Sequence, residues 1–506
     1  MGRLVQGVIL VCAATGCAVG PSYRRPELGV PAEWRRTDPT ADSLRPFYDS
    51  LMANRDTLPL NPERPDTVSG DTSAQAGVFL TDTTANLVWF DLLQDPELRK
   101  LVETALRENR DVRVAIATIN EFRAQYGVAK GDFFPQITLN AQGGRTKTVL
   151  GSIGAFTYNQ IQATADLSWE LDFWGRIRRS TEAARNDLLA QRENQRAVVL
   201  TLVGDVASVY LQLRQLDLEL EISRRTLAAN RETFRLARRR FDQGLISELD
   251  VRQFEAEVAS PAASVAQLEG LITQTENQLN LLVGRNPGGI PRGRPLTEVL
   301  GGLAVPEFSP ASLLERRPDV RQAEAQFHAA TARIGVAKGD LLPRLTVTGD
   351  YGTYSSNTDD LFKKDSEIYQ ILGGVSMPLF TGGRVGKQVD VARARAEQAR
   401  YSYEQTVLTA LREVEDAVAG VRASRNQVAA QQTQVDALRR ALRLAEMRYQ
   451  SGASSYLDLL DAQRSLFGAE LSLAQVQGQQ ATAAVTLYKA LGGGWPVAPA
   501  DSTTPR

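Results

Sequence analysis

Residues 129–135 read AKGDFFP, and residues 337–343, 208 positions later (337 − 129 = 208), read AKGDLLP. Four further matches keep this one offset, which chance similarity between helical sequences would not do over such a length. They pair 111–113 with 319–321, 175–176 with 383–384, 241–250 with 449–458, and Gly284 with Gly492. The sequence therefore predicts an internal two-fold repeat, and the elements within each copy decide the fold.

Two strand candidates follow each heptapeptide. In residues 161–169, apolar side chains alternate with polar ones from Ile161 to Trp169, which is typical of a strand with one apolar and one polar face. Weaker alternation marks the other candidates, at 137–142, 345–348 and 369–377. Strands of soluble β-sandwiches alternate in the same way, so this pattern alone does not assign the strands to a membrane.

The length and number of the strand candidates favour a membrane β-barrel. Runs of about ten residues suit strands that cross a membrane at a tilt. Four strands do not close a barrel, and open sheet edges do not occur in lipid, so the edges must pair with other subunits. We therefore predict a trimeric 12-stranded β-barrel (3 × 4), with four strands contributed by each chain.

Two very long helices follow the strands. No proline interrupts residues 176–243 or residues 384–451. About 65 helical residues, at about 1.5 Å per residue, reach about 100 Å. Apolar residues from Leu202 to Phe241 recur with 4-3 spacing, which predicts coiled-coil packing.

Shorter helical stretches accompany the long ones, at 95–133 and 247–283 in the first copy and at 311–341 and 456–491 in the second. Two short helices stacked end to end match one long helix. The sequence thus predicts a mainly α protein whose membrane β part continues into a long α-helical coiled-coil barrel. The same helices could instead form a solid bundle.

The N-terminus has the pattern of a secretory signal. One basic residue, Arg3, precedes an apolar stretch at 4–14 that is too short for a membrane helix of about 20 residues. Cys17 follows a small residue at the end of this leader and resembles the lipobox cysteine of bacterial lipoproteins, so we expect its acylation, as by palmitate. The lipobox usually has Leu where this chain has Ala14, and plain signal-peptide cleavage is the alternative.

Composition completes the outline of the chain. Residues 36–85 are rich in Asp, Thr, Pro and Ser without apolar periodicity, which predicts a poorly ordered segment. The predicted organisation is a signal peptide at 1–16, a lipid-anchored extended segment, partly disordered, at 17–94, repeat 1 at 95–284, a linker at 285–310, repeat 2 at 311–494 and a C-terminal tail at 495–506.

Several functions are disfavoured by what the sequence lacks. The formal net charge of −1 gives no indication of a nucleic-acid partner. Cys12 and Cys17 are the only cysteines and His328 is the only histidine, so no Cys/His cluster for catalysis or metal binding is available. No phosphate-binding loop or nucleophile–base pair emerges. We predict no enzyme, no cofactor and no metal site.

Four short motifs carry a resemblance to a known family: GPSYRRP at 20–26, RRPDV at 316–320, LFTGG at 379–383 and LYKALGGGW at 487–495. With the repeat, they make the chain similar to the outer-membrane factor family of tripartite efflux pumps, the TolC-like proteins, and especially to its lipidated OprM-like branch. The segment at 36–85 is longer than this family usually carries there.

The resemblance implies a homotrimer that is lipid-anchored in the outer membrane and extends into the periplasm. A periplasmic adaptor protein and an inner-membrane efflux pump would engage it. The chain would then be a passive exit duct for drugs or other small toxic solutes. A duct for type I protein secretion and a periplasmic coiled-coil scaffold are the alternatives, and the alternating strands favour a duct over the scaffold.

The turns that end the two long helices are the first candidate sites. They contain Gly244, Leu245 and Ser247 in the first copy, and Gly452, Ala453 and Ser454 in the second. Glycine supplies the left-handed conformation that ends a helix, and Ser247 or Ser455 can cap the next one. The resemblance implies that these exposed tips contact the adaptor.

A periplasmic gate is the second candidate site. Leu457 and Asp461 lie four residues apart and so share one helix face. The resemblance implies a closing ring of three leucines and three aspartates, whose repulsion would be reduced by cations, protons or an arginine such as Arg464. The first copy has Gln253 where the second has Asp461, so only the second copy carries the charge.

Overall fold

The computed structural model describes residues 18–26, 95–151, 154–299, 316–451 and 453–493. The predicted signal peptide, Cys17, most of the segment 17–94, Gly452 and the whole C-terminal tail therefore lie outside the described residues. The chain divides into two compact units. The first contains residues 110–199 and 318–409 with the N-terminal stretch, and the second contains residues 200–317 and 410–506 with the stretch before residue 110.

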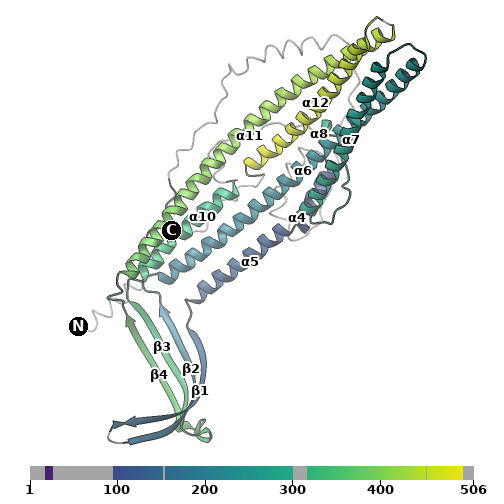
Figure 1. Cartoon of the computed structure of the whole chain (residues 1–506). Coiled ribbons are helices and arrows are strands. Elements are labelled where there is room, and N and C mark those ends of the chain that lie inside the picture. The colour runs from purple at the N-terminus through teal and green to yellow at the C-terminus, as the bar shows by residue number, and fades with distance from the viewer. Residues whose placement is uncertain (1–17, 27–94, 152–153, 300–315, 452, 494–506) are drawn as a thin grey trace, which may run out of the picture. The chain divides into compact units, whose positions relative to one another are not determined.

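The strands of the first unit form one antiparallel sheet in the order β1-β2-β3-β4 (Figure 1). All four strand predictions are confirmed, and each observed strand is longer than the alternating segment that predicted it. The strands are β1 (Gln136–Leu150), β2 (Gly154–Leu171), β3 (Arg344–Ser355) and β4 (Glu367–Ser376).

The register of the sheet separates apolar rows from polar rows. Leu139, Ala165, Tyr351 and Tyr369 lie side by side across the four strands. The next row contains Thr138, Asp166, Asp350 and Gln370. Successive residues of a strand point to opposite faces, so one face is apolar and the other polar. The apolar face is open to the surroundings, since 79% of Leu139 and 78% of Tyr369 are exposed.

The two long helices are confirmed. Each has 67 residues, and their first residues are 208 positions apart (384 − 176 = 208). They are α6 (Arg176–Asp242) and α11 (Arg384–Gln450). The shorter helices are α4 (Pro96–Glu108), α5 (Arg110–Gly131), α7 (Glu248–Val283), α8 (Leu296–Val299), α10 (Pro318–Gly339) and α12 (Tyr456–Ala490). The described chain is thus mainly helical with one small sheet.

Coiled-coil spacing places the apolar residues of the second unit in its core. Leu202, Val206 and Leu213 follow 4-3 spacing on α6 and are at most 6% exposed. An apolar 18-residue window of α6 is long enough to cross a membrane by composition, but 61% of that window is buried inside the chain. Packing within the chain therefore accounts for this apolar stretch.

The C-terminal ends of α7 and α12 have a similar structure. Gly284 and Gly492 have φ angles of +80° and +83°, which L-residues with a side chain rarely adopt. Beside them, Asn109 Nδ2 donates to Leu282 O at 2.9 Å, and Arg317 Nη1 donates to Ala490 O at 2.9 Å. The two donors are 208 residues apart in the sequence (317 − 109 = 208), and so are the two acceptors (490 − 282 = 208).

A buried polar cluster joins α4, α6 and the residues before α8. The Tyr210 hydroxyl donates to Asp95 Oδ2 at 2.9 Å and accepts from the backbone N–H of Gly293 at 2.8 Å. Asp95 also caps α4 by accepting from the backbone N–H of Leu98, and it accepts from that of Arg294. Burial raises the pKa of Tyr210, so its hydroxyl remains protonated and able to donate.

Replacing Tyr210 with Phe tests this cluster. The variant leaves the partly buried N–H of Gly293 without its acceptor and Asp95 without a donor, so we expect the free energy of unfolding to fall by about 1–3 kcal/mol. Guanidinium unfolding of the purified protein, followed by circular dichroism, measures the change. Tyr401→Phe is the control, because Tyr401 is 55% exposed. Equal unfolding midpoints for the two variants would contradict the role assigned to the cluster.

Candidate functional site: a polar groove and two helix tips

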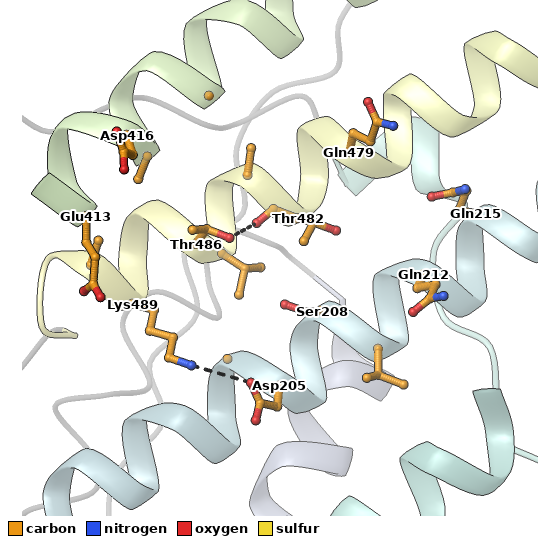
Figure 2. Close-up of a pocket in the computed structure, with 17 residues that line it drawn as sticks. Asp205, Ser208, Gln212, Gln215, Glu413, Asp416, Gln479, Thr482, Thr486 and Lys489 are labelled. Carbon is orange, nitrogen blue, oxygen red and sulfur yellow. Dashed lines mark hydrogen bonds and ion pairs between the residues drawn. The ribbon is translucent and has the colours of Figure 1, made fainter. Parts of the chain in front are cut away.

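A groove of about 840 Å³ lies between α6, α11 and α12 in the second unit (Figure 2). Gly204, Ser208 and Gln212 follow one another at four-residue spacing and so share one face of α6. Small-molecule sites are usually lined by aromatic and apolar side chains, whereas none of the 17 lining residues is aromatic. Polar side chains of α6 and α12 dominate its wall: Ser208, Gln212, Gln215, Gln479, Thr482 and Thr486.

Carboxylates outnumber cations in the groove. Lys489 Nζ lies 3.7 Å from Asp205 Oδ1, as the dashed line in Figure 2 shows. Glu413 accepts from Arg317 Nη2 at 2.7 Å, and Asp416 is 3.9 Å from Arg412. The side chains of Asp205, Lys489, Glu413 and Asp416 are partly open to water, whereas Arg317 is buried. The groove therefore presents more negative than positive charge to water.

A buried carboxylate lies next to the groove on α6. Glu219 is 7% exposed and accepts from Gln215 Nε2 at 2.8 Å. No arginine or lysine pairs with it among the described residues. Burial therefore raises the pKa of Glu219, while its hydrogen bonds from Gln215 and Gln475 lower it only in part. α6 and α12 lie close together at this point, because a β-carbon added at Gly478 of α12 would overlap the Gln215 side chain of α6.

The first helix tip has the predicted turn chemistry. Gly244 has a φ of +75° and its N–H donates to Phe241 O at 2.7 Å, which ends α6. Ser247 caps α7, since its hydroxyl accepts from the Asp250 N–H at 3.3 Å and its N–H donates to Asp250 Oδ2 at 3.0 Å. Leu245 is 68% exposed between them. The left-handed glycine and the serine cap are confirmed for this tip.

The second tip differs in its cap. Ala453 is exposed and its N–H donates to Arg448 O at 2.8 Å. The hydroxyl of Ser454 is buried without a partner among the described residues. Ser455 stands at the N-cap of α12, but the prediction that it caps this helix is wrong, because its side chain makes no capping hydrogen bond, in contrast to Ser247. The predicted role of Gly452 cannot be placed because this residue lies outside the described part of the chain.

The proposed gate residues lie on the first three turns of α12. Leu457 is 58% exposed, and Asp461 is exposed one turn further on. Arg464 forms its ion pair with Glu257 of α7. This hydrogen-bonded pair raises the pKa of Arg464, so the arginine stays charged. Within one chain, Arg464 therefore neutralises Glu257.

Glu257 is a buried charged residue that the sequence analysis did not single out. It is 8% exposed, and its backbone carbonyl accepts from Asn230 of α6. Beside it, the rings of Phe254 and Tyr456 lie 3.8 Å apart between centroids. One feature of the sequence could have indicated it: Glu257 is an acidic residue three positions after Phe254, on the same face of α7, and the helix buries that face. The Glu257–Arg464 ion pair and the Phe254–Tyr456 contact thus hold α7 against α12 close to the tips.

A second buried carboxylate links three helices. Glu470 of α12 is 7% exposed and accepts from Arg225 of α6 at 2.6 Å and from Arg439 of α11 at 2.7 Å. Its equivalent in the first copy is Ala262 (470 − 208 = 262). The described residues contain no group of three His, Cys, Asp or Glu side chains that could hold a metal ion.

Comparison with known proteins decides the family. The model of the family described as outer membrane efflux protein matches residues 101–285 and 310–493. The chain belongs to the outer membrane efflux protein family. Both matched segments fall on the predicted repeats. The resemblance drawn from the four short motifs is confirmed.

Relatives of this outer membrane efflux protein serve different pumps. The toluene efflux pump outer membrane protein TtgI of Pseudomonas putida is 37% identical over 411 residues, 80% of this chain and 87% of that protein. The cation efflux system protein CusC of Escherichia coli is 30% identical over 483 residues, 95% of this chain and 97% of that protein.

A solved structure supports the same assignment. The open state of the Neisseria gonorrhoeae MtrE outer membrane channel is similar with a TM-score of 0.78 and 28% identity, covering 95% of this chain and 99% of that one. The protein is therefore a channel subunit of an efflux system in the outer membrane, and its role is transport rather than catalysis.

Replacing Glu219 with Gln tests the buried carboxylate. Because the folded-state pKa lies above the ordinary 4.5, the stability from protonated Glu219 is complete below pH 4.5 and is lost as the pH rises through the raised pKa. We expect the variant to unfold at higher guanidinium than the wild type at pH 7.5, with the difference shrinking toward pH 4.5. Glu221→Gln, at an exposed position of the same helix, is the control and should show no such trend.

Proposed function

We propose that three copies of this chain form a duct that is closed at its periplasmic end and opened by an adaptor protein and an inner-membrane pump. The cargo would be drugs or other small toxic solutes. The observation that carries the proposal is the link between α7 and α12 directly above the tips, beside the exposed pair Leu457 and Asp461.

Unpaired surfaces of the first unit support the trimer. The sheet ends in β1 on one side and β4 on the other, and both edges carry backbone groups that need partners in lipid. Three sheets joined edge to edge would give twelve strands (3 × 4). Exposed apolar side chains also occur on α5, as at Val128, and on α11, as at Leu408. Neighbouring subunits would cover these side chains.

The stretch that follows Cys17 supports a lipid anchor beside the sheet. The Val19 N–H donates to Trp174 O at 3.0 Å, three residues after β2 ends. Tyr23 stacks on His328 with ring centroids 4.6 Å apart, and its hydroxyl donates to Glu324 at 3.0 Å. An acyl chain on Cys17 would therefore start within two residues of a fixed point next to β2.

The organisation into two repeats, at 95–284 and 311–494, is part of the proposal. The equal lengths of α6 and α11 and the matched ends at Gly284 and Gly492 support it. Three chains of two copies would place six similar helical modules (3 × 2) around one axis. The copies differ at Gln253 and Asp461, so the gate charge would occur three times and not six.

Opening would separate the links above the tips. Three Asp461 carboxylates near one axis would hold a closed ring when cations or protons neutralise their repulsion, and Leu457 would close the ring on the side of the tips. The Glu257–Arg464 pair and the Phe254–Tyr456 contact would hold α7 and α12 together in this closed arrangement. An adaptor that binds both tips would favour the arrangement in which these contacts are broken.

Cargo selection would lie elsewhere in the pump. Named relatives serve toluene and cation efflux, and the groove of this chain has no aromatic lining and no metal-binding cluster among the described residues. A wall without a dedicated site is compatible with either class of solute. Protein secretion is the second candidate function, but no observation on the described residues favours it.

Replacing Asp461 with Ala tests the gate. Removing three carboxylates from the proposed ring removes the groups through which cations would hold the closed state. The single-channel conductance or the open probability of the purified trimer in planar bilayers is therefore expected to rise several-fold. Gln253→Ala, at the matching position of the first copy, and Asp458→Ala, an exposed aspartate one turn nearer the tip, are the controls. A conductance and open probability equal to those of the wild type would overturn the assignment of Asp461.

Replacing Glu257 with Gln tests the link. The change keeps the size of the side chain but removes the buried charge that Arg464 pairs with, so α7 and α12 should separate more often. We expect longer open times in the same bilayers and uptake of vancomycin by cells carrying the variant. Glu255→Gln is the matched control, because Glu255 is exposed and, among the described residues, pairs only with Arg252 of its own helix. If Glu257→Gln shows the open times and the vancomycin uptake of the wild type, the link between α7 and α12 does not restrain opening.

A further inference from the structure

A second pocket, of about 580 Å³, lies in the first unit, near the place where α5 and α6 join the sheet (Figure 1). Its lining comes from the C-terminal part of α5 and the residues just after it, from the first four turns of α6, and from His328 of α10. Two arginines, Arg178 and Arg185, and one carboxylate, Glu182, are among the lining residues. The pocket therefore combines positive charge with the apolar ring of Phe133.

The N-terminal stretch marks the outer side of α6. A β-carbon added at Gly175, directly before α6, would overlap Ala18, so the stretch passes over this point. Glu182 comes seven residues later and so lies on the same face. It pairs with Nε2 of His328 at 3.0 Å, and the ring of Tyr23 stacks on this histidine. The lipid anchor proposed above has to reach the membrane around the barrel, so this face of α6 would be turned outward and not toward the lumen.

The pocket opens on this outer side. Arg178 and Arg185 lie four residues before Glu182 and three residues after it, and so share its face of α6. α6 is also an inner helix of the chain, because α5 leads into β1, α6 follows β2, α10 leads into β3 and α11 follows β4. Neighbouring subunits joined at the sheet edges would meet α5 and α11. The outer face of α6 would then remain uncovered in the trimer.

Aromatic side chains indicate the depth of the pocket relative to the membrane. Phe133 lies three residues before β1 begins, and its carbonyl accepts from Trp169 Nε1 of β2 at 2.9 Å. Trp174 lies three residues after β2 ends, and its Nε1 donates to Pro343 O at 2.8 Å. Tryptophan is enriched where a membrane meets water. The pocket therefore lies next to the level at which the headgroups of the periplasmic leaflet would lie.

Arg185 is a cation of the pocket that no carboxylate neutralises. It is exposed and forms no ion pair within the part of the chain that the structure describes. The carboxylate in the lining, Glu182, is already paired with Arg179 at 2.8 Å and hydrogen-bonded to His328. An anion that enters the pocket would thus meet the guanidinium of Arg185 without competition from Glu182.

Other polar groups show that the pocket has a formed wall. Asn186 is 6% exposed, and its Nδ2 donates to the backbone carbonyl of Glu182 at 2.8 Å. Arg178 is held by Asp172 at 3.1 Å, while 39% of its side chain stays exposed. These contacts fix the direction of the α6 side chains around the cavity before any ligand binds.

We propose that this pocket binds the phosphate group of a phospholipid from the leaflet that faces the periplasm. The planar guanidinium of Arg185 suits phosphate, because it donates two parallel hydrogen bonds to two oxygens of one group. Arg178 would add a second positive charge. Phe133 and Leu189, which also line the pocket, would pack against the glycerol and the first acyl carbons. The inference rests on the proposed function, in which the sheet spans the outer membrane.

The test measures lipid binding to the purified full-length trimer by native mass spectrometry, with dioleoylphosphatidylglycerol as the probe. One tightly bound phospholipid per chain is expected. Arg185→Glu should weaken this binding about tenfold or more, because an attraction for phosphate becomes a repulsion. Arg192→Glu is the matched control and should bind as the wild type does. Arg192 is also exposed and lies seven residues further along the same face of α6, outside the pocket.

Two further probes separate the possible sources of phosphate. Dioleoylglycerol has the same acyl chains without the phosphate, and inorganic phosphate has the anion without the chains. The wild type should bind dioleoylglycerol more weakly than the phospholipid, and Arg185→Glu should bind it as the wild type does. Displacement of the phospholipid by millimolar inorganic phosphate would show a site for free phosphate and would overturn the lipid assignment.

The remaining outcomes decide between the pocket and the duct. Equal phospholipid binding by Arg185→Glu and the wild type, or an equal loss in Arg192→Glu, overturns the pocket. Heat-modifiable trimer bands and single-channel conductance, recorded for each variant, show whether it is assembled. A wild type that forms conducting trimers without binding phospholipid overturns the pocket and leaves the proposed function intact, whereas a wild type that forms no conducting trimer overturns the proposed function itself. Intermediate binding by Arg185→Lys would support the contribution of the guanidinium group.

Discussion

Backbone N–H and C=O groups within a membrane need hydrogen-bond partners from the protein, because the hydrocarbon offers none. In the proposed duct, this chain contributes one four-stranded sheet to the membrane, and β1 and β4 are the strands with an open edge each. Pairing of these edges with other subunits would then be a condition of insertion rather than a later event. Lipid would cover the apolar face of the sheet, which carries Leu139 and Tyr369 and is exposed in the single chain.

In the proposed duct the helical part would face a different demand, since a hollow tube must hold together without a continuous core. The coiled-coil seam of α6 supplies local packing, and buried carboxylates supply the specific links. Glu470 connects α12 to both long helices, and Glu257 connects α7 to α12 through Arg464. Breaking a buried ion pair leaves an uncompensated charge, so each link favours one arrangement of helices strongly.

These links are where the two copies of the module diverge. The first copy has Ala262 in place of Glu470 (470 − 208) and Ala256 in place of Arg464 (464 − 208). Shared positions such as Gly284 and Gly492 preserve the shape of the module, whereas the charged positions differ. A tube built from equivalent copies would have no reason to open at one hairpin first. The divergence gives the second hairpin its own charges and its own contacts.

Local spacing in the sequence determined the strands, the two 67-residue helices, the glycine that ends α6 and the family of the protein. These features depend on residues near one another in the chain, through alternation, heptads and turn chemistry. Only the tertiary structure decided that Arg464 pairs with Glu257, 207 residues away, and that Arg317 closes the end of α12 at Ala490. Such pairs depend on how each helix is rotated about its axis and which faces meet, and periodicity places a charge on a face without naming its partner.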